Sequence, residues 1–123
     1  MSNIFKKTLL YDFYGELLTK HQKGIYELYH LNDLSLGEIS EQLEISRQGV
    51  YDTLKRCDRQ LENYENKLQL VDKFLINKQN IEKIYSDASE ILDELRSSDQ
   101  TKKEIVDKIV NIQKTCNRII EEL

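Results

Sequence analysis

Apolar side chains recur along most of this chain at intervals of three and four residues, which is the period of one face of an α-helix. Two such sets lie before residue 30. The first set comprises Phe5, Leu9, Leu10, Phe13, Tyr14, Leu17 and Leu18. The second set follows the capping-box pattern Thr19-Lys-His-Gln22 and comprises Ile25, Tyr26, Leu28 and Tyr29. The pattern predicts two helices, of which the second begins at Lys20.

Residues 35–56 have the pattern of two helices that cross at a tight turn. Ser35-Leu-Gly-Glu38 is a second capping box and opens a helix that ends near Leu43. Glu44 and Ile45 make the turn, and Ser46 stands where the next helix needs its N-cap. The apolar side chains that close a small core between the two helices are Ile39, Leu43, Ile45, Val50 and Leu54. This arrangement predicts a helix-turn-helix whose turn lies near residues 44–46.

Heptad seams follow to the end of the chain. Their members are Leu61, Tyr64, Leu68, Val71 and Leu75, then Ile81, Ile84, Ala88, Ile91 and Leu95, then Ile105, Ile109, Ile112, Cys116, Ile119 and Leu123. The first two seams are out of phase, which predicts a bend or break within residues 74–77. The polar run 96–100 separates the second seam from the third, and Thr101 would cap the helix that carries the third seam. Such narrow seams must pack on each other in a hairpin or on another chain, and the strict repeat favours a homo-oligomer, with a dimer preferred.

Composition supports an all-helical chain with a modest core. The 123 residues include no proline and four glycines, and 33% of them are charged. We therefore predict an all-α fold in two parts. Residues 1–60 hold the N-terminal helices and a helix-turn-helix without a wing, and residues 61–123 form a long coiled-coil-like helical extension for oligomerisation.

The charge distribution gives only weak support to DNA binding. The formal net charge is -4, whereas dedicated nucleic-acid binders usually carry a basic surplus. Between residues 46 and 59, however, the bases outnumber the acids Asp52 and Asp58. We expect the second helix of the helix-turn-helix, with its N-cap, to contact nucleic acid through Ser46, Arg47, Gln48, Tyr51, Lys55, Arg56 and Arg59.

The expected roles follow from which side of the helix faces the core. With Val50, Leu54, Cys57 and Leu61 inward, the outward residues are Arg47, Gln48, Tyr51, Asp52 and Lys55. Arginine suits guanine and glutamine suits adenine, while Lys55, Arg56 and Arg59 could hold phosphates. Asp52 and the preceding acids Glu38, Glu41 and Glu44 would repel phosphates. A helix-turn-helix used as a protein-binding scaffold therefore remains an alternative, with the three glutamates either solvated or docking a basic partner.

Nothing in the chain has the spacing of a catalytic, cofactor or metal site. We expect no enzymatic activity and no cofactor. Cys57 and Cys116 are isolated thiols, which suits a reducing cytoplasm. The first residues lack the apolar core of a signal peptide, and no run approaches the roughly 18 apolar residues of a membrane span. These features predict a cytoplasmic protein without membrane insertion.

Several blocks together resemble the YlxM family of helix-turn-helix regulators. They are Leu10-Tyr-Asp-Phe-Tyr14, Leu17-Leu-Thr-Lys-His-Gln22, Tyr26-Glu-Leu-Tyr29, Asp33-Leu-Ser-Leu-Gly-Glu-Ile39, Ser46-Arg-Gln-Gly-Val-Tyr-Asp52, Leu54-Lys-Arg56 and Tyr64-Glu-Asn-Lys-Leu68. The resemblance covers about residues 8–75, and the helix-turn-helix is also similar to region 4 of sigma factors. Ser40 and Gly49 stand where the family usually has alanine.

The family resemblance also implies a cellular pathway, which the residues alone do not indicate. Members are usually encoded beside the signal recognition particle GTPase Ffh or its receptor FtsY. The resemblance therefore implies an accessory or regulatory protein of that targeting pathway, which would bind the GTPase or its RNA. The alternatives are a sequence-specific transcription regulator and an oligomeric scaffold.

Overall fold

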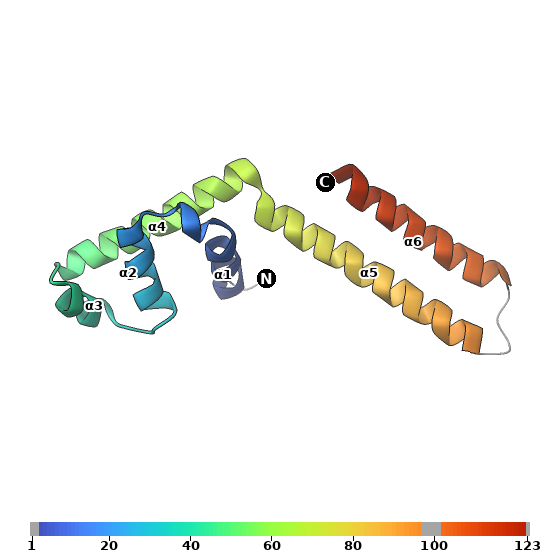
Figure 1. Cartoon of the computed structure of the whole chain (residues 1–123), viewed down its shortest axis with the longest axis horizontal. Helices are drawn as coiled ribbons and strands as arrows, with labels where there is room; N and C mark the ends of the chain where they lie inside the picture. Colours follow the sequence, from blue (N-terminus) through green and yellow to red (C-terminus); the bar gives the residue numbers. More distant parts are fainter. Residues whose placement is uncertain (1–2, 97–101, 123) are drawn as a thin grey trace. The chain divides into compact units, whose positions relative to one another are not determined.

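The computed structural model describes residues 3–96 and 102–122, and in these residues the backbone is helical with no strand. The elements, in order, are α1 (Asn3–Tyr14), the 3₁₀ turn η1 (Gly15–Leu17), α2 (Lys20–His30), α3 (Leu36–Leu43), α4 (Arg47–Leu68), α5 (Leu70–Arg96) and α6 (Lys102–Glu122) (Figure 1). They form two compact units, Met1–Val71 and Asp72–Leu123. The predicted all-α fold with a helix-turn-helix is confirmed.

Polar side chains set the beginnings of α2 and α3, as the sequence predicts. Thr19 Oγ1 accepts the Gln22 N–H at 3.2 Å, and the Gln22 side chain accepts the Thr19 N–H, which completes the capping box of α2. Ser35 and Glu38 form the same reciprocal pair at α3. These bonds satisfy backbone donors that have no partner within the helix.

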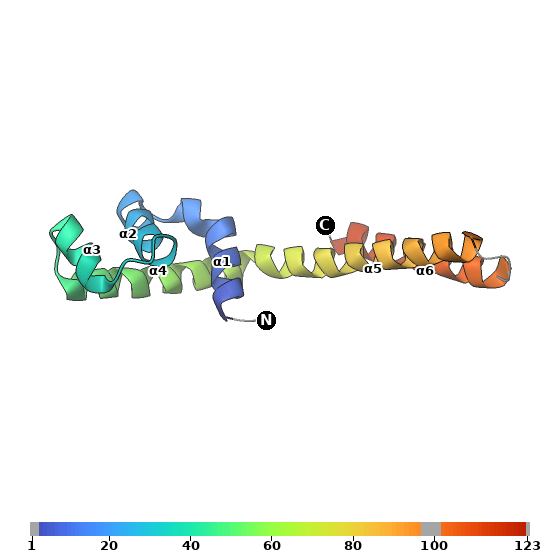
Figure 2. The same ribbon diagram turned by 90° about the horizontal axis from the view of Figure 1, so that it is seen from below.

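Helices α1, α2 and α3 all pack against α4 and build the core of the first unit (Figure 2). The side chains that this core buries most completely are Tyr14, Ile25, Ile39, Val50, Cys57 and Leu61. The predicted inward positions of α4 are therefore confirmed. Some expected core residues are instead more than a third exposed, namely Phe5, Phe13, Leu17, Tyr29 and Leu43. For Leu17 the cause is η1, which breaks the helical period after Tyr14.

The break in the C-terminal half lies at Gln69 and not within residues 74–77, so that prediction was wrong. Gln69 has a left-handed backbone, with φ of 55°, and ends α4. Helix α5 then continues unbroken through residues 74–77. The first compact unit extends to Val71, whereas the sequence suggested a division between residues 60 and 61. Tyr14 of α1 still contacts α4 at Tyr64 and Glu65, beyond that division.

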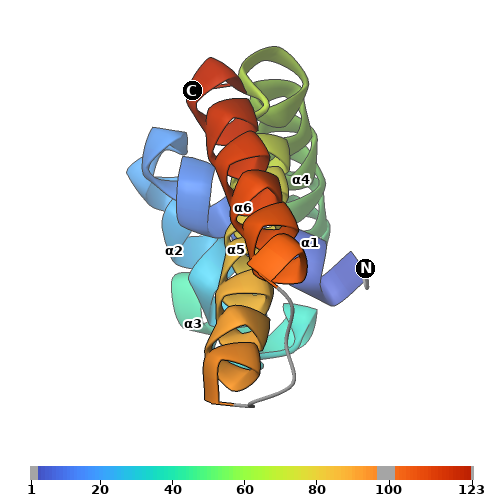
Figure 3. The ribbon, with the colours of Figure 1, turned by 90° about the vertical axis from the view of Figure 1, so that its right-hand side faces the viewer.

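The second unit is a pair of antiparallel helices, with α5 and α6 side by side (Figure 1 and Figure 3). Lys108 of α6 forms ion pairs with Glu90 at 3.5 Å and with Glu94, both on α5. The hairpin considered for the seams is thus formed within one chain. Of the polar break predicted at residues 96–100, Arg96 is the last residue of α5. Residues 97–100, the Thr101 cap and the seam position Leu123 lie outside the described residues.

Candidate nucleic-acid interface

The turn between α3 and α4 depends on a left-handed residue that is not glycine. Glu44 has φ of 57° and ψ of 41°, and the Ile45 N–H donates to the Ser40 carbonyl at 3.2 Å. Ser46 then caps α4, since its Oγ accepts the Gly49 N–H at 2.9 Å. Behind the turn, Ile39 and Val50 are fully buried. These bonds and contacts fix α4 across α3 and turn its opposite side to solvent.

The exposed side of α4 carries every side chain that the sequence assigned to nucleic acid. The exposed residues are Ser46, Arg47, Gln48, Tyr51, Lys55, Arg56 and Arg59, together with Asp52. Gln48, Asp52, Lys55 and Arg59 recur at three- and four-residue intervals, so they form one stripe along the helix. The fold therefore brings the proposed base-reading and phosphate-binding groups onto one surface. Ser46 differs from the others because its hydroxyl oxygen is already used by the helix cap.

Two local contacts order side chains on this surface. Gln48 Nε2 donates a hydrogen bond of 2.9 Å to Asp52 Oδ1, one helical turn further on. Lys55 Nζ lies 5.5 Å from the centre of the Tyr51 ring, within the range of a cation–π contact. Asp52 therefore binds a glutamine amide rather than an arginine on this surface.

Two lysines of α1 that the sequence reasoning missed neutralise acidic side chains of α4. Lys7 Nζ lies 3.8 Å from Asp58 Oδ2, and Lys6 Nζ lies 3.6 Å from Glu62 Oε1. Within the described residues, no ion pair involves Arg47, Arg56 or Arg59. The lysines come from a helix about fifty residues away in sequence, and no motif marks them, so only the packing of α1 on α4 reveals this neutralisation.

The acidic residues of α3 do not form a uniform free surface. Glu38, Glu41 and Glu44 are all exposed, as expected. Glu38 Oε1, however, accepts the Ser35 N–H at 3.2 Å and belongs to the capping box. Glu44 supplies the left-handed turn residue. Glu41 is therefore the member of the set whose charge can be changed with least effect on the fold.

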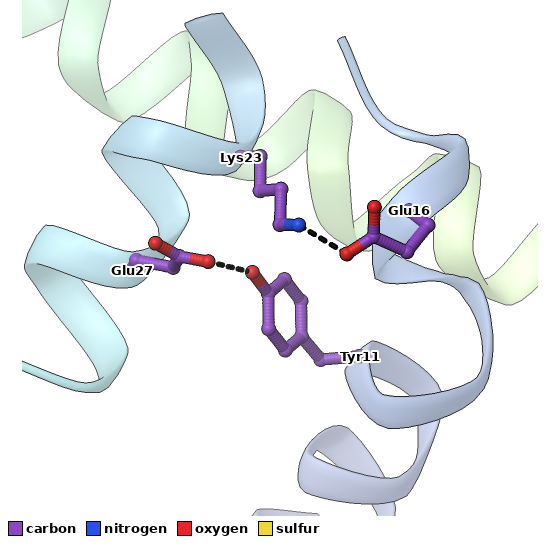
Figure 4. A network of polar contacts seen from close by, with 4 residues as sticks. All are labelled: Tyr11, Glu16, Lys23 and Glu27. Carbon is purple, nitrogen blue, oxygen red and sulfur yellow. Dashed lines mark hydrogen bonds and ion pairs between the residues drawn. The ribbon is translucent and has the colours of Figure 1, made fainter. Parts of the chain in front are cut away.

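A polar network joins α1 and η1 to α2 (Figure 4). The Tyr11 hydroxyl donates to Glu27, and Lys23 pairs with Glu16. The Tyr11 ring also stacks on Tyr26 with centroids 4.7 Å apart. Burial, followed by the Glu27 hydrogen bond, raises the pKa of Tyr11, and burial raises the pKa of Tyr26 to about 12. Both phenols thus remain protonated at neutral pH and brace the helices that support α4.

Three further observations concern metal ligands, the buried thiol and membrane spans. They contain no group of three or more His, Cys, Asp or Glu that could hold a metal ion. Burial raises the pKa of the Cys57 thiol to about 11, which keeps it protonated and poorly nucleophilic. No helix among these residues is long and apolar enough to cross a membrane.

The fold and this surface define an all-α protein with a helix-turn-helix of the DNA-binding type. Residues 1–112 match the UPF0122 family, described as "putative helix-turn-helix protein, YlxM / p13 like". The chain belongs to this family, which confirms the resemblance found in its sequence. The likeness to sigma factor region 4 and the coiled-coil character of the C-terminal helices stay predictions.

Individual relatives extend the match over different lengths. A UPF0122 protein of Acetivibrio thermocellus is 46% identical over 123 residues, which is 100% of this chain and 97% of the relative. A UPF0122 protein of Listeria welshimeri is 42% identical over 113 residues, which is 89% of this chain and 99% of the relative. A UPF0122 protein of Caldanaerobacter subterraneus is 65% identical over 77 residues, which is 63% of this chain and 66% of the relative. For two Thermoanaerobacter relatives the match spans 55% of their length.

Proposed function

We propose that this protein is a sequence-specific DNA-binding regulator that lays α4 in the major groove. The observation that carries this proposal is the solvent-facing side of α4. It presents Arg47, Arg56 and Arg59 without ion pairs among the described residues, next to the base-reading amide of Gln48. Helix-turn-helix proteins contact base edges with the first residues of this helix.

The two ends of the exposed surface have different tasks in this proposal. Arg47 and Gln48 lie in the first turn of α4 and contact bases, whereas Lys55, Arg56 and Arg59 lie further along the helix and contact phosphates. Asp52 holds one N–H of the Gln48 amide. The second N–H and the oxygen remain for the N7 and the amino group of adenine. Asp52 is thus a positioning residue.

The overall charge favours base-dependent over indiscriminate binding. The chain carries -4, and Glu41 and Glu44 are exposed near the start of α4. Because nonspecific affinity comes from phosphate neutralisation, a protein of this charge binds random duplex weakly. Its affinity for a target would depend on contacts from Arg47 and Gln48.

Selection from a random duplex library, followed by fluorescence-anisotropy titration, tests the proposal. We expect one enriched sequence, and Arg47→Ala should cost about 1–3 kcal/mol on it and relax base choice at one position. Arg96→Ala removes an exposed arginine of α5 and serves as the matched control, with unchanged affinity. Equal affinity of the wild type for every duplex would overturn the proposal.

A second candidate is an accessory protein of the signal recognition particle pathway that binds its GTPase or RNA. It is supported by the family resemblance and by the exposed carboxylates of Glu41 and Glu44, which suit a basic protein surface. Glu41→Lys should weaken binding to the purified GTPase, whereas Glu82→Lys, an exposed control on α5, should not. No saturable binding of wild type to the GTPase or to its RNA would exclude this candidate.

In both candidates the protein works in the cytoplasm without catalysis, metal or cofactor. The helix-turn-helix family supports this assignment. An oligomeric scaffold without DNA or particle binding is the remaining alternative from the sequence. It would give saturable self-association with none of the binding described above.

A further inference from the structure

A groove in the first unit lies beside the exposed surface of α4, and we call it the Lys7 groove. Its volume is about 150 Å³, well above the roughly 10–15 Å³ that one water molecule requires. Its wall consists of Lys7 of α1, Tyr29 and His30 of α2, Leu36 of α3, and Tyr51, Leu54, Lys55 and Asp58 of α4. Because Tyr51 and Lys55 also belong to the surface that the sequence assigned to nucleic acid, the Lys7 groove continues that surface toward α1 and α2.

Free hydrogen-bond donors line the Lys7 groove. Lys7 Nζ lies 3.8 Å from Asp58 Oδ2, which is beyond the roughly 3.2 Å of a direct hydrogen bond, so its three N–H donors remain available. Tyr29 and Tyr51 are 40% and 44% exposed, and within the described residues neither hydroxyl has a hydrogen-bond partner. Lys55 Nζ lies 5.5 Å from the centre of the Tyr51 ring, which holds a second ammonium group at the wall.

The charges in the wall of the Lys7 groove favour an anion. Asp58 is the one carboxylate in this wall, and Lys7 offsets its charge. Lys55 forms no ion pair among the described residues. Burial lowers the pKa of His30 below its ordinary value of 6.5, so its ring adds no charge at pH 7. The wall therefore carries one net positive charge.

The surroundings of the wall do not reverse this sign. The acids of α1, of residues 27–38 and of residues 52–62, other than Asp58, lie outside the wall and are Asp12, Glu27, Asp33, Glu38, Asp52 and Glu62. Glu62 is offset by Lys6, and Arg56 and Arg59 of α4 have no ion pair among the described residues. Since His30 ends α2 and Leu36 begins α3, the partial charges of these two helix ends are opposite in sign and offset each other.

The Lys7 groove lies at one flank of the surface that faces away from the core. Successive residues of a helix are about 100° apart, so Tyr51 and Asp58 are displaced from Asp52 and Arg59 by that angle in the same direction. This displacement places them between the outward residues of α4 and its buried side. The ion pair of Lys7 with Asp58 shows that α1 covers this flank.

We infer that the Lys7 groove holds one phosphate of the DNA strand that borders the major groove on the side of α1 and α2. The inference rests on the proposed function, because it requires α4 to lie in a major groove. That groove is about 12 Å wide and its edges carry the phosphates, so a helix inside it has phosphates at its flanks. Lys7 and Lys55 bind the phosphate oxygens, and the tyrosine hydroxyls donate to them. Lys7 is thereby a DNA-binding residue outside the helix-turn-helix.

Salt-dependent anisotropy with a duplex selected from the random library tests the role of Lys7. Lys7→Gln should reduce the slope of the logarithm of the association constant against the logarithm of salt concentration by about 0.9. Its deficit relative to wild type should therefore grow about eightfold for each tenfold decrease in salt concentration. Lys6→Gln is the matched control, because Lys6 also pairs with an acid of α4 but does not line the Lys7 groove. This control should keep the wild-type slope.

A second pair of variants separates phosphate binding from neutralisation of Asp58. In an Asp58→Asn background there is no carboxylate for Lys7 to offset, so adding Lys7→Gln should still reduce the slope by about 0.9. No effect of Lys7→Gln in that background would overturn the inference. The Lys6 and Lys7 side chains are 45% and 49% exposed, so helix content by circular dichroism should be unchanged.

Neutral methylphosphonates, placed one at a time in the selected duplex, locate the phosphate. One position should weaken binding of the wild type and of Lys6→Gln but not of Lys7→Gln, because that variant no longer contacts the phosphate replaced there. Equal effects on wild type and Lys7→Gln at every position would overturn the inference while leaving the proposed function intact. Equal affinity of the wild type for every duplex in the library would overturn both.

Discussion

The Tyr14 hydroxyl of α1 donates a 2.5 Å hydrogen bond to Glu65 Oε1 of α4, across fifty-one residues of sequence. The same two groups also receive the first backbone donors of α5. Tyr14 Oη accepts the Leu70 N–H and Glu65 Oε1 accepts the Val71 N–H, each at 3.0 Å. This pair thus replaces a conventional N-cap at the point where left-handed Gln69 ends α4.

Tyr14→Phe should destabilise the first unit by about 1–3 kcal/mol. The substitution keeps the ring but removes the hydroxyl, so Leu70 N–H loses its acceptor and Glu65 loses a donor. Urea denaturation followed by circular dichroism would measure the change in the free energy of unfolding. Tyr29→Phe, at a tyrosine that is 40% exposed, is the control and should change stability by less than about 0.5 kcal/mol. Equal effects of the two substitutions would contradict the capping role.

The helix-turn-helix could be predicted from sequence because its signals are local. Ser35, Glu38 and Ser46 act within three residues of their partners, and the inward set of α4 follows one helical period. The outward placement of Arg47, Gln48 and Lys55 follows from the same period.

Features that depend on contacts between residues distant in sequence could not be predicted from the sequence. No glycine or proline marks the break at Gln69 in the sequence. The break is stabilised partly by Tyr14, which is distant in sequence, through its hydrogen bond with the Leu70 N–H. The Lys7–Asp58 ion pair likewise depends on the packing of α1 on α4. The heptad seams indicated the apolar side of each helix, but not which part of it the partner helix would cover.

Two glycines should respond oppositely to alanine. A Cβ at Gly15 would lie 2.8 Å from Tyr11 Cε2, and this ring cannot easily retreat because it stacks on Tyr26. Gly15→Ala should therefore cost about 1–3 kcal/mol of unfolding free energy. Gly24 lies within α2 with nothing within 4 Å of its Cβ position, so Gly24→Ala should stabilise by about 0.5–1 kcal/mol. Thermal denaturation of both variants measures this, and a shift in the same direction would refute the packing argument.

His30 should make the first unit less stable in mild acid. Burial lowers the pKa of His30 below its ordinary value of 6.5, with Lys7 adding to the shift and Asp58 opposing it. As the pH falls below 6.5, the unfolded chain therefore takes up a proton before the folded one does. The free energy of unfolding decreases until the pH passes the folded pKa.

Comparison of wild type with His30→Asn isolates this effect from the carboxylates. Over roughly pH 7 to 5, the wild type should lose more stability than the variant. Parallel stability curves for wild type and His30→Asn would contradict the assignment.

The two cysteines should react at very different rates with a thiol reagent. Cys57 is fully buried, and burial raises its pKa to about 11, whereas Cys116 is partly exposed. At mildly alkaline pH, one thiol per chain should react quickly and the second only as the first unit unfolds. A Cys116→Ser variant should lose the fast phase alone. Rapid labelling of that variant would show that Cys57 is accessible and that the core is not packed as described.

The most direct test of DNA binding by α4 is the salt dependence of affinity for a duplex selected from the random library. The logarithm of the association constant should fall with the logarithm of salt concentration, by about 0.9 for each phosphate contacted. Alanine at Lys55, Arg56 and Arg59 together should reduce that slope by about one for each phosphate that the variant no longer binds. A slope that is the same in wild type and in this variant would contradict the account, because the exposed cations of α4 would then not be touching DNA.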